Sequence, residues 1–282
     1  GESILTNPPL SWLLLLGALT AFAPMSIDMY LPSLPAIAAA FATDSAAAQY
    51  TLASFFIGLA LGQAVYGPLA DRYGRKPPLY AGLALYIVAS IGCALAPDIA
   101  TLTVLRFVQA IGGCAGVVIA RAVVRDRFDA RTSAKIYSLL MLVMGLAPIL
   151  APIMGGWILA LASWRAIFGV LALFGFATLL LSWRHLPETR PANAIGDGGV
   201  GAALRVYGDL LRDRNFIGYA LSGGFALGGM FAYITGSPHV FIELYGVPAQ
   251  YYGWLFGLNA MGLIASSQHN RRLLTHHTAD EI

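Results

Sequence analysis

The sequence predicts an all-α protein that crosses a membrane several times, and three observations support this fold class. Hydrophobic residues make up 58% of the 282 positions, and the mean hydropathy is +0.70. Charged residues make up only 11%, whereas a soluble domain carries about 25%. The charges gather in short segments between apolar runs of about 20 residues, which is the length that spans a bilayer core. We therefore expect an integral membrane protein.

Eight apolar runs predict eight membrane-spanning helices. Their approximate bounds are 11–34, 47–69, 78–96, 101–123, 136–160, 165–183, 216–240 and 250–267. The first run contains Pro24, Pro32 and Pro35, so we expect its helix to kink and to end early. Pro148 and Pro152 predict a bend in the fifth helix for the same reason.

The placement of Lys and Arg predicts the orientation. Of the 17 basic residues, 14 lie in the loops 70–77, 124–135 and 184–215 or in the tail. The opposite loops hold only Arg165. By the positive-inside rule, the charged loops and the N-terminus are cytoplasmic. We read Arg121 and Arg125, near the cytoplasmic end of the fourth helix, as anchors that reach the headgroups.

A long polar segment divides the chain. We expect a six-helix N-terminal bundle over 1–183, a cytoplasmic linker over 184–215, the first two helices of a second bundle over 216–267, and a cytoplasmic tail over 268–282. Within the linker, 204–214 predicts a short amphipathic helix on the inner surface. Because the chain begins with Gly1 and ends in a charged tail, we expect a fragment or a processed chain.

Several function classes are disfavoured by the sequence. Cys93 and Cys114 lie inside apolar runs, where we expect small packing residues and neither a disulfide nor a metal site. No H-E-x-x-H, P-loop or G-x-S-x-G pattern is present, so we expect neither an enzyme nor an ATP-driven pump, and no cofactor. Nucleic-acid binding is disfavoured because the basic residues lie in short loops between apolar runs.

The turn between the second and third runs is the strongest motif. It reads Gly67-Pro68-Leu69-Ala70-Asp71-Arg72-Tyr73-Gly74-Arg75-Lys76. The two glycines permit close helix approach and unusual backbone angles, and Asp71 can pair with the neighbouring cations. The segment resembles the G-x-L-A-D-R-x-G-R-K loop of the major facilitator superfamily. We call its Gly67, Asp71, Arg72, Gly74, Arg75 and Lys76 the latch, which the resemblance implies is a conformational element.

Two charges inside the apolar runs are candidate proton-coupling residues. Burying the carboxylate of Asp28 in a membrane costs several kcal/mol, so it is interfacial, paired, or protonated for part of a cycle. Counting at about 1.5 Å per residue places Asp28 and Arg106 at a similar depth, about 8 Å below the outer boundary of a roughly 30 Å core. The pair is thus a plausible one. The alternatives are an Asp28 that caps a broken helix and an Arg106 satisfied by backbone carbonyls.

The resemblance extends to the fourth and fifth helices. Arg106-Phe107-Val108-Gln109-Ala110-Ile111-Gly112 is similar to the family's R-x-x-Q-G-x-G motif, with Ala110 in place of glycine. In proton-driven antiporters of the family this arginine is tied to proton coupling. The fifth helix resembles the antiporter signature G-x-x-x-G-P-x-x-G-G through Pro148, Pro152, Gly155 and Gly156, although two alanines replace its leading glycines. Any tightly packed, proline-kinked helix is the alternative.

The run from Ser26 to Pro35 resembles the bicyclomycin-resistance/CflA type of drug:proton antiporter in particular. Six polar or aromatic residues are candidates for lining a substrate pocket, and each also fits plain helix packing. They are Tyr30, Gln109, Phe225, Phe231, Tyr233 and Asn259.

The resemblance implies a multi-pass protein of the bacterial inner membrane that exports small amphipathic drugs in exchange for protons by alternating access. Its partners would be a small-molecule substrate, protons and the lipid bilayer, without nucleic acid, and the complete protein would be a monomer. A metabolite or nutrient carrier of the same fold is one alternative. A receptor or assembly subunit that does not transport is another. We expect residues 1–282 alone not to transport.

Overall fold

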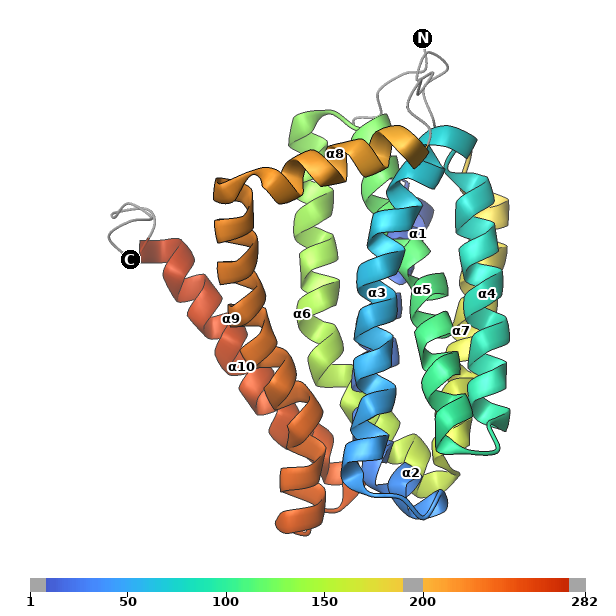
Figure 1. Cartoon of the computed structure of the whole chain (residues 1–282), viewed down its shortest axis with the longest axis vertical. Coiled ribbons are helices and arrows are strands. Elements are labelled where there is room, and N and C mark those ends of the chain that lie inside the picture. The colour runs from blue at the N-terminus through green and yellow to red at the C-terminus, as the bar shows by residue number, and fades with distance from the viewer. Residues whose placement is uncertain (1–8, 190–199, 274–282) are drawn as a thin grey trace.

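Long apolar runs form long helices because a helix satisfies every backbone hydrogen bond within its own segment, which a membrane demands. The computed structural model describes residues 9–189 and 200–273, and every regular element within those ranges is helical. The elements are α1 (Leu10–Asp28), a 3₁₀ turn η1 (Leu31–Ser33), α2 (Leu34–Ala40), α3 (Ser45–Tyr73), α4 (Lys76–Leu95), α5 (Ile99–Arg127), α6 (Ala130–Leu161), α7 (Trp164–His185), α8 (Val200–Arg212), α9 (Arg214–Pro238), a π-helix η2 (His239–Leu244) and α10 (Ala249–Leu273) (Figure 1).

Aspartates start several of these helices. Asp44, Asp98 and Asp129 each accept a hydrogen bond from the backbone N–H three residues later, at 2.8, 2.7 and 3.1 Å. Such caps satisfy one of the N–H groups that a helix N-terminus leaves unpaired. The hydrogen bond from the Thr101 backbone N–H, together with one from the Thr101 hydroxyl, lowers the pKa of Asp98.

The first predicted helix is broken, as its prolines indicate. α1 ends at Asp28, and η1 and α2 continue the chain to Ala40. By contrast, α6 is one continuous helix that contains Pro148 and Pro152. Within the described residues, seven segments are long and apolar enough to cross a membrane. The eighth predicted span is a 25-residue helix, α10, but it is not among those seven, since polar residues such as Gln250 and Asn259 interrupt its apolar sequence.

The first six spans form one bundle in which α5 is central and packs against α1, α3 and α4. Glycines bring these helices together. A Cβ added at Gly112 of α5 would lie 2.5 Å from the Tyr86 nitrogen and 2.7 Å from the Gly82 oxygen of α4. A Cβ added at Gly58 of α3 would lie 2.5 Å from the Phe107 oxygen of α5.

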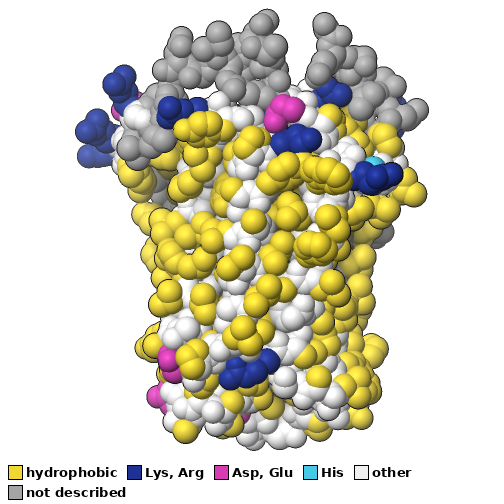
Figure 2. All heavy atoms as spheres, turned by 90° about the vertical axis from the view of Figure 1, so that its right-hand side faces the viewer, with side chains coloured by type: hydrophobic (Ala, Val, Ile, Leu, Met, Phe, Trp, Pro, Cys, Tyr) yellow, Lys and Arg dark blue, Asp and Glu magenta, His cyan; other side chains and the backbone are white. Residues whose placement is uncertain are grey.

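Helix α8 crosses the ends of the other helices, which matches the predicted amphipathic segment (Figure 1). It leads into α9 and α10, and α10 packs against α6. We call the two ends of the molecule the α8 end and the α2 end. Figure 2 shows that hydrophobic side chains cover the middle of the face it presents, while charged side chains gather towards the two ends. The parts of the predicted linker and tail over 190–199 and 274–282 lie outside the described residues.

Candidate functional site

The latch joins α3 to α4 at the α8 end and is built around one buried arginine. Arg75 Nη1 lies 2.7 Å from Asp71 Oδ1, so the predicted pairing within the turn is confirmed. Arg75 Nε and Nη2 also donate to the two carboxylate oxygens of Asp126 on α5, at 2.7 and 3.2 Å. The side chains of Arg75 and Asp126 are 4% and 6% exposed, whereas that of Asp71 is 62% exposed. Asp126 is therefore the enclosed partner, which the sequence analysis missed.

The negative charges of Asp71 and Asp126 favour the protonated form of Arg75. Burial alone would lower the pKa of Arg75, but the hydrogen bonds and negative charges of Asp126 and Asp71 outweigh it, so the pKa is raised. The other two cations contact aromatic rings. The Arg72 guanidinium lies 5.1 Å from the centre of the Tyr73 ring, and the Lys76 ammonium lies 5.8 Å from that of Tyr80.

A second missed residue, Glu188, binds the latch from the chain that follows α7. Its carboxylate accepts hydrogen bonds from the backbone N–H groups of Arg75 and Lys76, at 2.7 and 3.1 Å, at the start of α4. Thr189 Oγ1 donates to Asp126 Oδ2 at 3.3 Å. An acidic residue just past the sixth apolar run, on the same predicted side as the latch, was the available signal in the sequence.

The two latch glycines differ. Gly74 has φ +92°, a conformation that L side chains rarely adopt, which confirms the expected unusual backbone. Gly67 lies inside α3, and a Cβ added there would meet no atom within 4 Å. The expected close helix approach at Gly67 is therefore wrong; the residue lines a cavity instead.

Arg106 of α5 is fully buried in the bundle. Its Nη1 donates to Gln109 Oε1 at 2.6 Å, and its Nη2 donates to the backbone oxygen of Ser26 at 3.0 Å. The guanidinium carbon lies 4.3 Å from the centre of the Tyr30 ring and 4.2 Å from that of Phe55. Aromatic faces attract a cation in this geometry, so rings and neutral oxygens hold this charge.

Asp28 is buried as the last residue of α1. The structure places no ion pair or hydrogen bond on its carboxyl group among the described residues, so the expected contact between Asp28 and Arg106 is not formed. Counting residues placed Arg106 level with this part of α1, since it binds the Ser26 backbone oxygen. It did not give the side of α1 on which Asp28 lies. Two residues after Ser26, the helix has turned by about 200°, so Asp28 faces away from Arg106.

The helix-5 signature lies on α6, beside the backbone of the residue that follows Asp28. A Cβ added at Gly155 would overlap the backbone oxygen of Met29, the residue after Asp28. A Cβ added at Gly156 would lie 2.5 Å from the Ala249 oxygen at the start of α10. The signature therefore lets α6 approach both the break in α1 and the start of α10, and Pro152 is buried in the same stretch.

The six candidate substrate-lining residues do not form one pocket. Tyr30 and Gln109 are buried against Arg106, and the Tyr30 hydroxyl lies 2.6 Å from Thr51 Oγ1. Tyr233 stacks on Phe256; Asn259 lies on α10. Phe231 packs against Phe56 of α3, whereas Phe225 is 79% exposed.

A further polar contact joins the first bundle to the helices that follow it at the α2 end. The Ser45 hydroxyl, at the start of α3, lies 2.9 and 2.8 Å from the two carboxylate oxygens of Glu243 in η2. His239 Nδ1 lies 2.6 Å from Glu243 Oε2. We call Ser45, His239 and Glu243 the clasp. The sequence analysis did not identify it, because its two sides are far apart along the chain.

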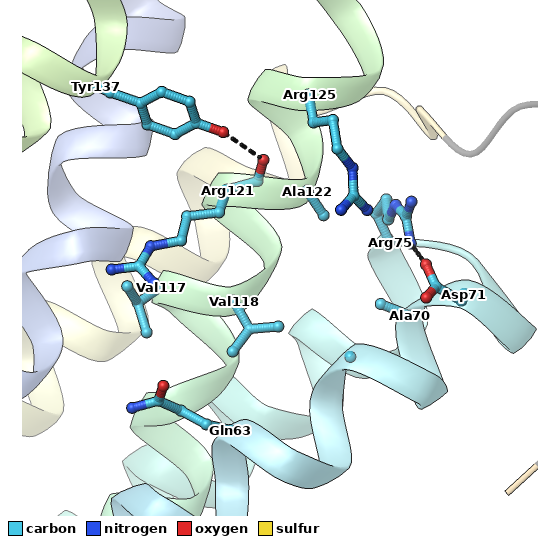
Figure 3. A pocket seen from close by; sticks show the side chains of 11 residues that line it. Gln63, Ala70, Asp71, Arg75, Val117, Val118, Arg121, Ala122, Arg125 and Tyr137 are labelled. Carbon is cyan, nitrogen blue, oxygen red and sulfur yellow. Dashed lines mark hydrogen bonds and ion pairs between the residues drawn. The ribbon is translucent and has the colours of Figure 1, made fainter. Parts of the chain in front are cut away.

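At the α8 end, α3, α5 and α6 surround a cavity of about 280 Å³ (Figure 3). Its lining includes Asp71 and Arg75 of the latch and Arg121 and Arg125 of α5. Tyr137 of α6 donates a hydrogen bond to the Arg121 backbone oxygen at 3.2 Å.

Membrane-length helices, a broken first span and a charged turn between the second and third spans define a multi-pass membrane protein. A family model described as Major Facilitator Superfamily matches residues 16–279. The chain belongs to the major facilitator superfamily, as its motifs indicated.

Sequence relatives support the same assignment. The chain is 43% identical over 255 residues to an uncharacterized MFS-type transporter, YdgK, of Bacillus subtilis, covering 90% of this chain and 63% of the relative. It is 35% identical over 264 residues to a bicyclomycin resistance protein homolog of Haemophilus influenzae, covering 94% and 66%. It is 33% identical over 243 residues to the multidrug resistance protein MdtL of Escherichia coli, covering 86% and 61%. The chain thus spans less than two thirds of each relative's length, and the predicted resemblance to the bicyclomycin-resistance type is confirmed.

Solved structures show the fold. A bacterial homologue of the human lysosomal transporter Spinster, in an inward-facing and unoccupied conformation, matches with a TM-score of 0.72 at 17% identity, over 96% of this chain and 65% of that one. A D-xylose-proton symporter matches with a TM-score of 0.65 at 15% identity, over 89% and 65%.

Proposed function

We propose that this chain is part of a proton-coupled exporter of small amphipathic compounds that works by alternating access. The observation that carries the proposal is the buried carboxyl of Asp28, which has no cationic or hydrogen-bonding partner among the described residues. An ionised carboxylate in that position costs several kcal/mol. A proton removes this cost, so Asp28 would bind a proton when enclosed and release it when water reaches the site.

Arg106, on α5, would act on this cycle through its contact with α1. Its guanidinium holds the backbone oxygen of Ser26, two residues before Asp28. A change in backbone conformation at the break after Asp28 would therefore move the oxygen that Arg106 binds, without a direct ion pair between the two side chains. Gly155 supports the same coupling, because its missing side chain lets α6 lie against the Met29 carbonyl at this break.

The two ends of the molecule would provide the alternating gates. The arginine-rich loops favour the α8 end as cytoplasmic, which also makes the N-terminus cytoplasmic. The clasp closes the α2 end by joining Ser45 to Glu243, whereas a cavity opens at the α8 end. This combination supports an inward-facing state. The latch would bias the cycle by fixing α3 to α4 and α5 through Arg75.

The names of the relatives favour drugs over nutrients as substrates. One relative is called a bicyclomycin resistance protein homolog and another a multidrug resistance protein. We extend export to this chain as a proposal, together with the division into an N-terminal bundle over 1–183 and the start of a second over 216–267. Because the relatives are longer, we expect residues 1–282 alone to lack transport.

The test is efflux of a fluorescent amphipathic dye from cells that express the complete reading frame containing this chain, with and without Asp28→Asn. A protonophore control runs beside each strain. We expect efflux to require both the proton gradient and Asp28. Gradient-dependent efflux that is indifferent to Asp28→Asn would place the coupling site elsewhere. If no dye moves in any strain, a metabolite carrier becomes the better account.

A further inference from the structure

The cavity at the α8 end carries an excess of positive charge. Of its charged lining residues, Arg75 is neutralised by Asp71 and Asp126 in the latch. Arg121 and Arg125 remain, and neither makes an ion pair in the part of the chain that the structure describes. They are four residues apart on α5, which places them on neighbouring turns of one helix face.

The Arg121 side chain extends along α5 towards the start of that helix. Side chains on a helix lean towards its N-terminus, and α5 starts at the α2 end, so a cation near its last turns leans towards the bilayer centre. Figure 3 shows the Arg121 side chain running towards Val117, one turn earlier. This direction favours a cavity-facing role for Arg121 over the headgroup anchor expected from the sequence.

The walls of the cavity combine apolar and polar surface around Arg121. Val117, Val118 and Ala122 supply apolar surface beside Arg121, while Gln63 and Tyr137 supply polar groups at the edge. The Arg121 guanidinium is exposed to an arriving ligand, and a guanidinium binds carboxylate, sulfonate or phosphate oxygens through charge-assisted hydrogen bonds. The volume, about 280 Å³, is at the small end of ligand sites and suits one acidic group with part of an attached ring.

We propose that this cavity is the cytoplasmic access site for transported compounds and that it selects those bearing an acidic group, with Arg121 as the main anion contact. The inference rests on the proposed export function and narrows its substrate class. Arg125 supports the site from the rim, next to the latch, so an arriving anion lies within reach of the element that biases the conformational cycle.

The first experiment measures binding of fluorescein to the purified complete protein in phosphatidylcholine nanodiscs, by fluorescence anisotropy at low salt. We expect Arg121→Gln to weaken binding at least tenfold and Arg121→Lys to retain most of it, because the charge is kept. The matched control is Arg184→Gln, which removes an exposed arginine near the end of α7 that does not line the cavity. Equal affinity in the wild type and Arg121→Gln would overturn the inference.

The second experiment separates this inference from the proposed function. Efflux of fluorescein, an anion, is compared with efflux of rhodamine 123, a cation on the same xanthene core. We expect the wild type to export fluorescein, and Arg121→Gln to lose that export while its rhodamine 123 export is unchanged or higher. Export of rhodamine 123 alone by the wild type overturns the acidic selectivity but leaves drug export standing. Fluorescein binding that depends on Arg121, without export of either dye, supports the site and counts against drug export.

A lipid headgroup offers the same chemistry as an acidic substrate. The binding measurement is therefore repeated in nanodiscs containing phosphatidylglycerol. We expect fluorescein to bind with similar affinity in both membranes. If phosphatidylglycerol abolishes binding to the wild type, the site belongs to the lipid headgroup and the substrate assignment fails.

Discussion

Arg75 provides an internal comparison, because it binds the enclosed carboxylate of Asp126 through two hydrogen bonds and the exposed carboxylate of Asp71 through one. Asp126→Asn would leave the guanidinium, whose side chain is 4% exposed, without its enclosed counter-charge. Removing one partner of a buried pair costs about 3–5 kcal/mol. We expect about 3 kcal/mol, since the asparagine keeps one acceptor and Asp71 remains. Asp71→Asn removes a carboxylate that is 62% exposed, and exposed pairs contribute at most about 1 kcal/mol.

Hydrogen exchange at the start of α4 measures the difference. The backbone N–H groups of Arg75 and Lys76 are held by Glu188, so they exchange when the latch opens locally. At about 1.4 kcal/mol per factor of ten, Asp126→Asn should speed their exchange about 100-fold, and Asp71→Asn about fivefold at most. Equal effects of the two substitutions would refute the reasoning that the enclosed carboxylate of Asp126, with its two hydrogen bonds, is the stronger partner of Arg75.

Three further predictions concern packing, capping and the clasp. Gly112→Ala should lower stability by about 2 kcal/mol through overpacking against α4, whereas Gly169→Ala, where a Cβ meets no atom within 4 Å, should be neutral or stabilising; thermal unfolding in detergent compares them, and equal losses would contradict the packing argument. Asp98 has a lowered pKa in the folded chain, so its cap contributes stability above the unfolded carboxyl pKa of about 3.9 and loses it as pH falls through the lower folded value. Hydrogen exchange in the first turn of α5 should therefore accelerate in acid, and Asp98→Asn should abolish that pH dependence; an unchanged profile would count against the cap. Glu243→Gln should weaken the bond to Ser45 and speed exchange at the start of α3, while unaltered exchange would mean that the clasp does not hold the α2 end.

Motifs with local geometry were predictable from the sequence. The break after Asp28 followed from the close spacing of Pro32 and Pro35, which start η1 and α2, although α6 continues through its own two prolines. The Asp71–Arg75 pair followed from their spacing of four residues. The amphipathic helix α8 followed from apolar residues interspersed among Arg and Asp. Helix bounds were close because apolar length in a membrane protein is set by the thickness of the bilayer.

Contacts between distant segments were not predictable in the same way. Asp126 and Glu188 reach Arg75 from 51 and 113 residues away, and no periodicity in one sequence gives the rotation of a helix about its axis. The expected contact between Asp28 and Arg106 failed for this reason. Counting residues gives the depth of a side chain along its helix but not the side of the helix on which it lies. To find which way the Arg121 side chain extends, we needed the chain direction of α5 as well as the place of Arg121 along it.

The central claim is that Asp28 carries the exchanged proton. The most direct measurement is proton movement in proteoliposomes containing the complete protein, followed with an internal pH dye after a transported compound is added on one side. We predict substrate-driven proton counterflow for the wild type and its loss in Asp28→Asn, with substrate binding retained. Counterflow of equal size in Asp28→Asn would contradict the account.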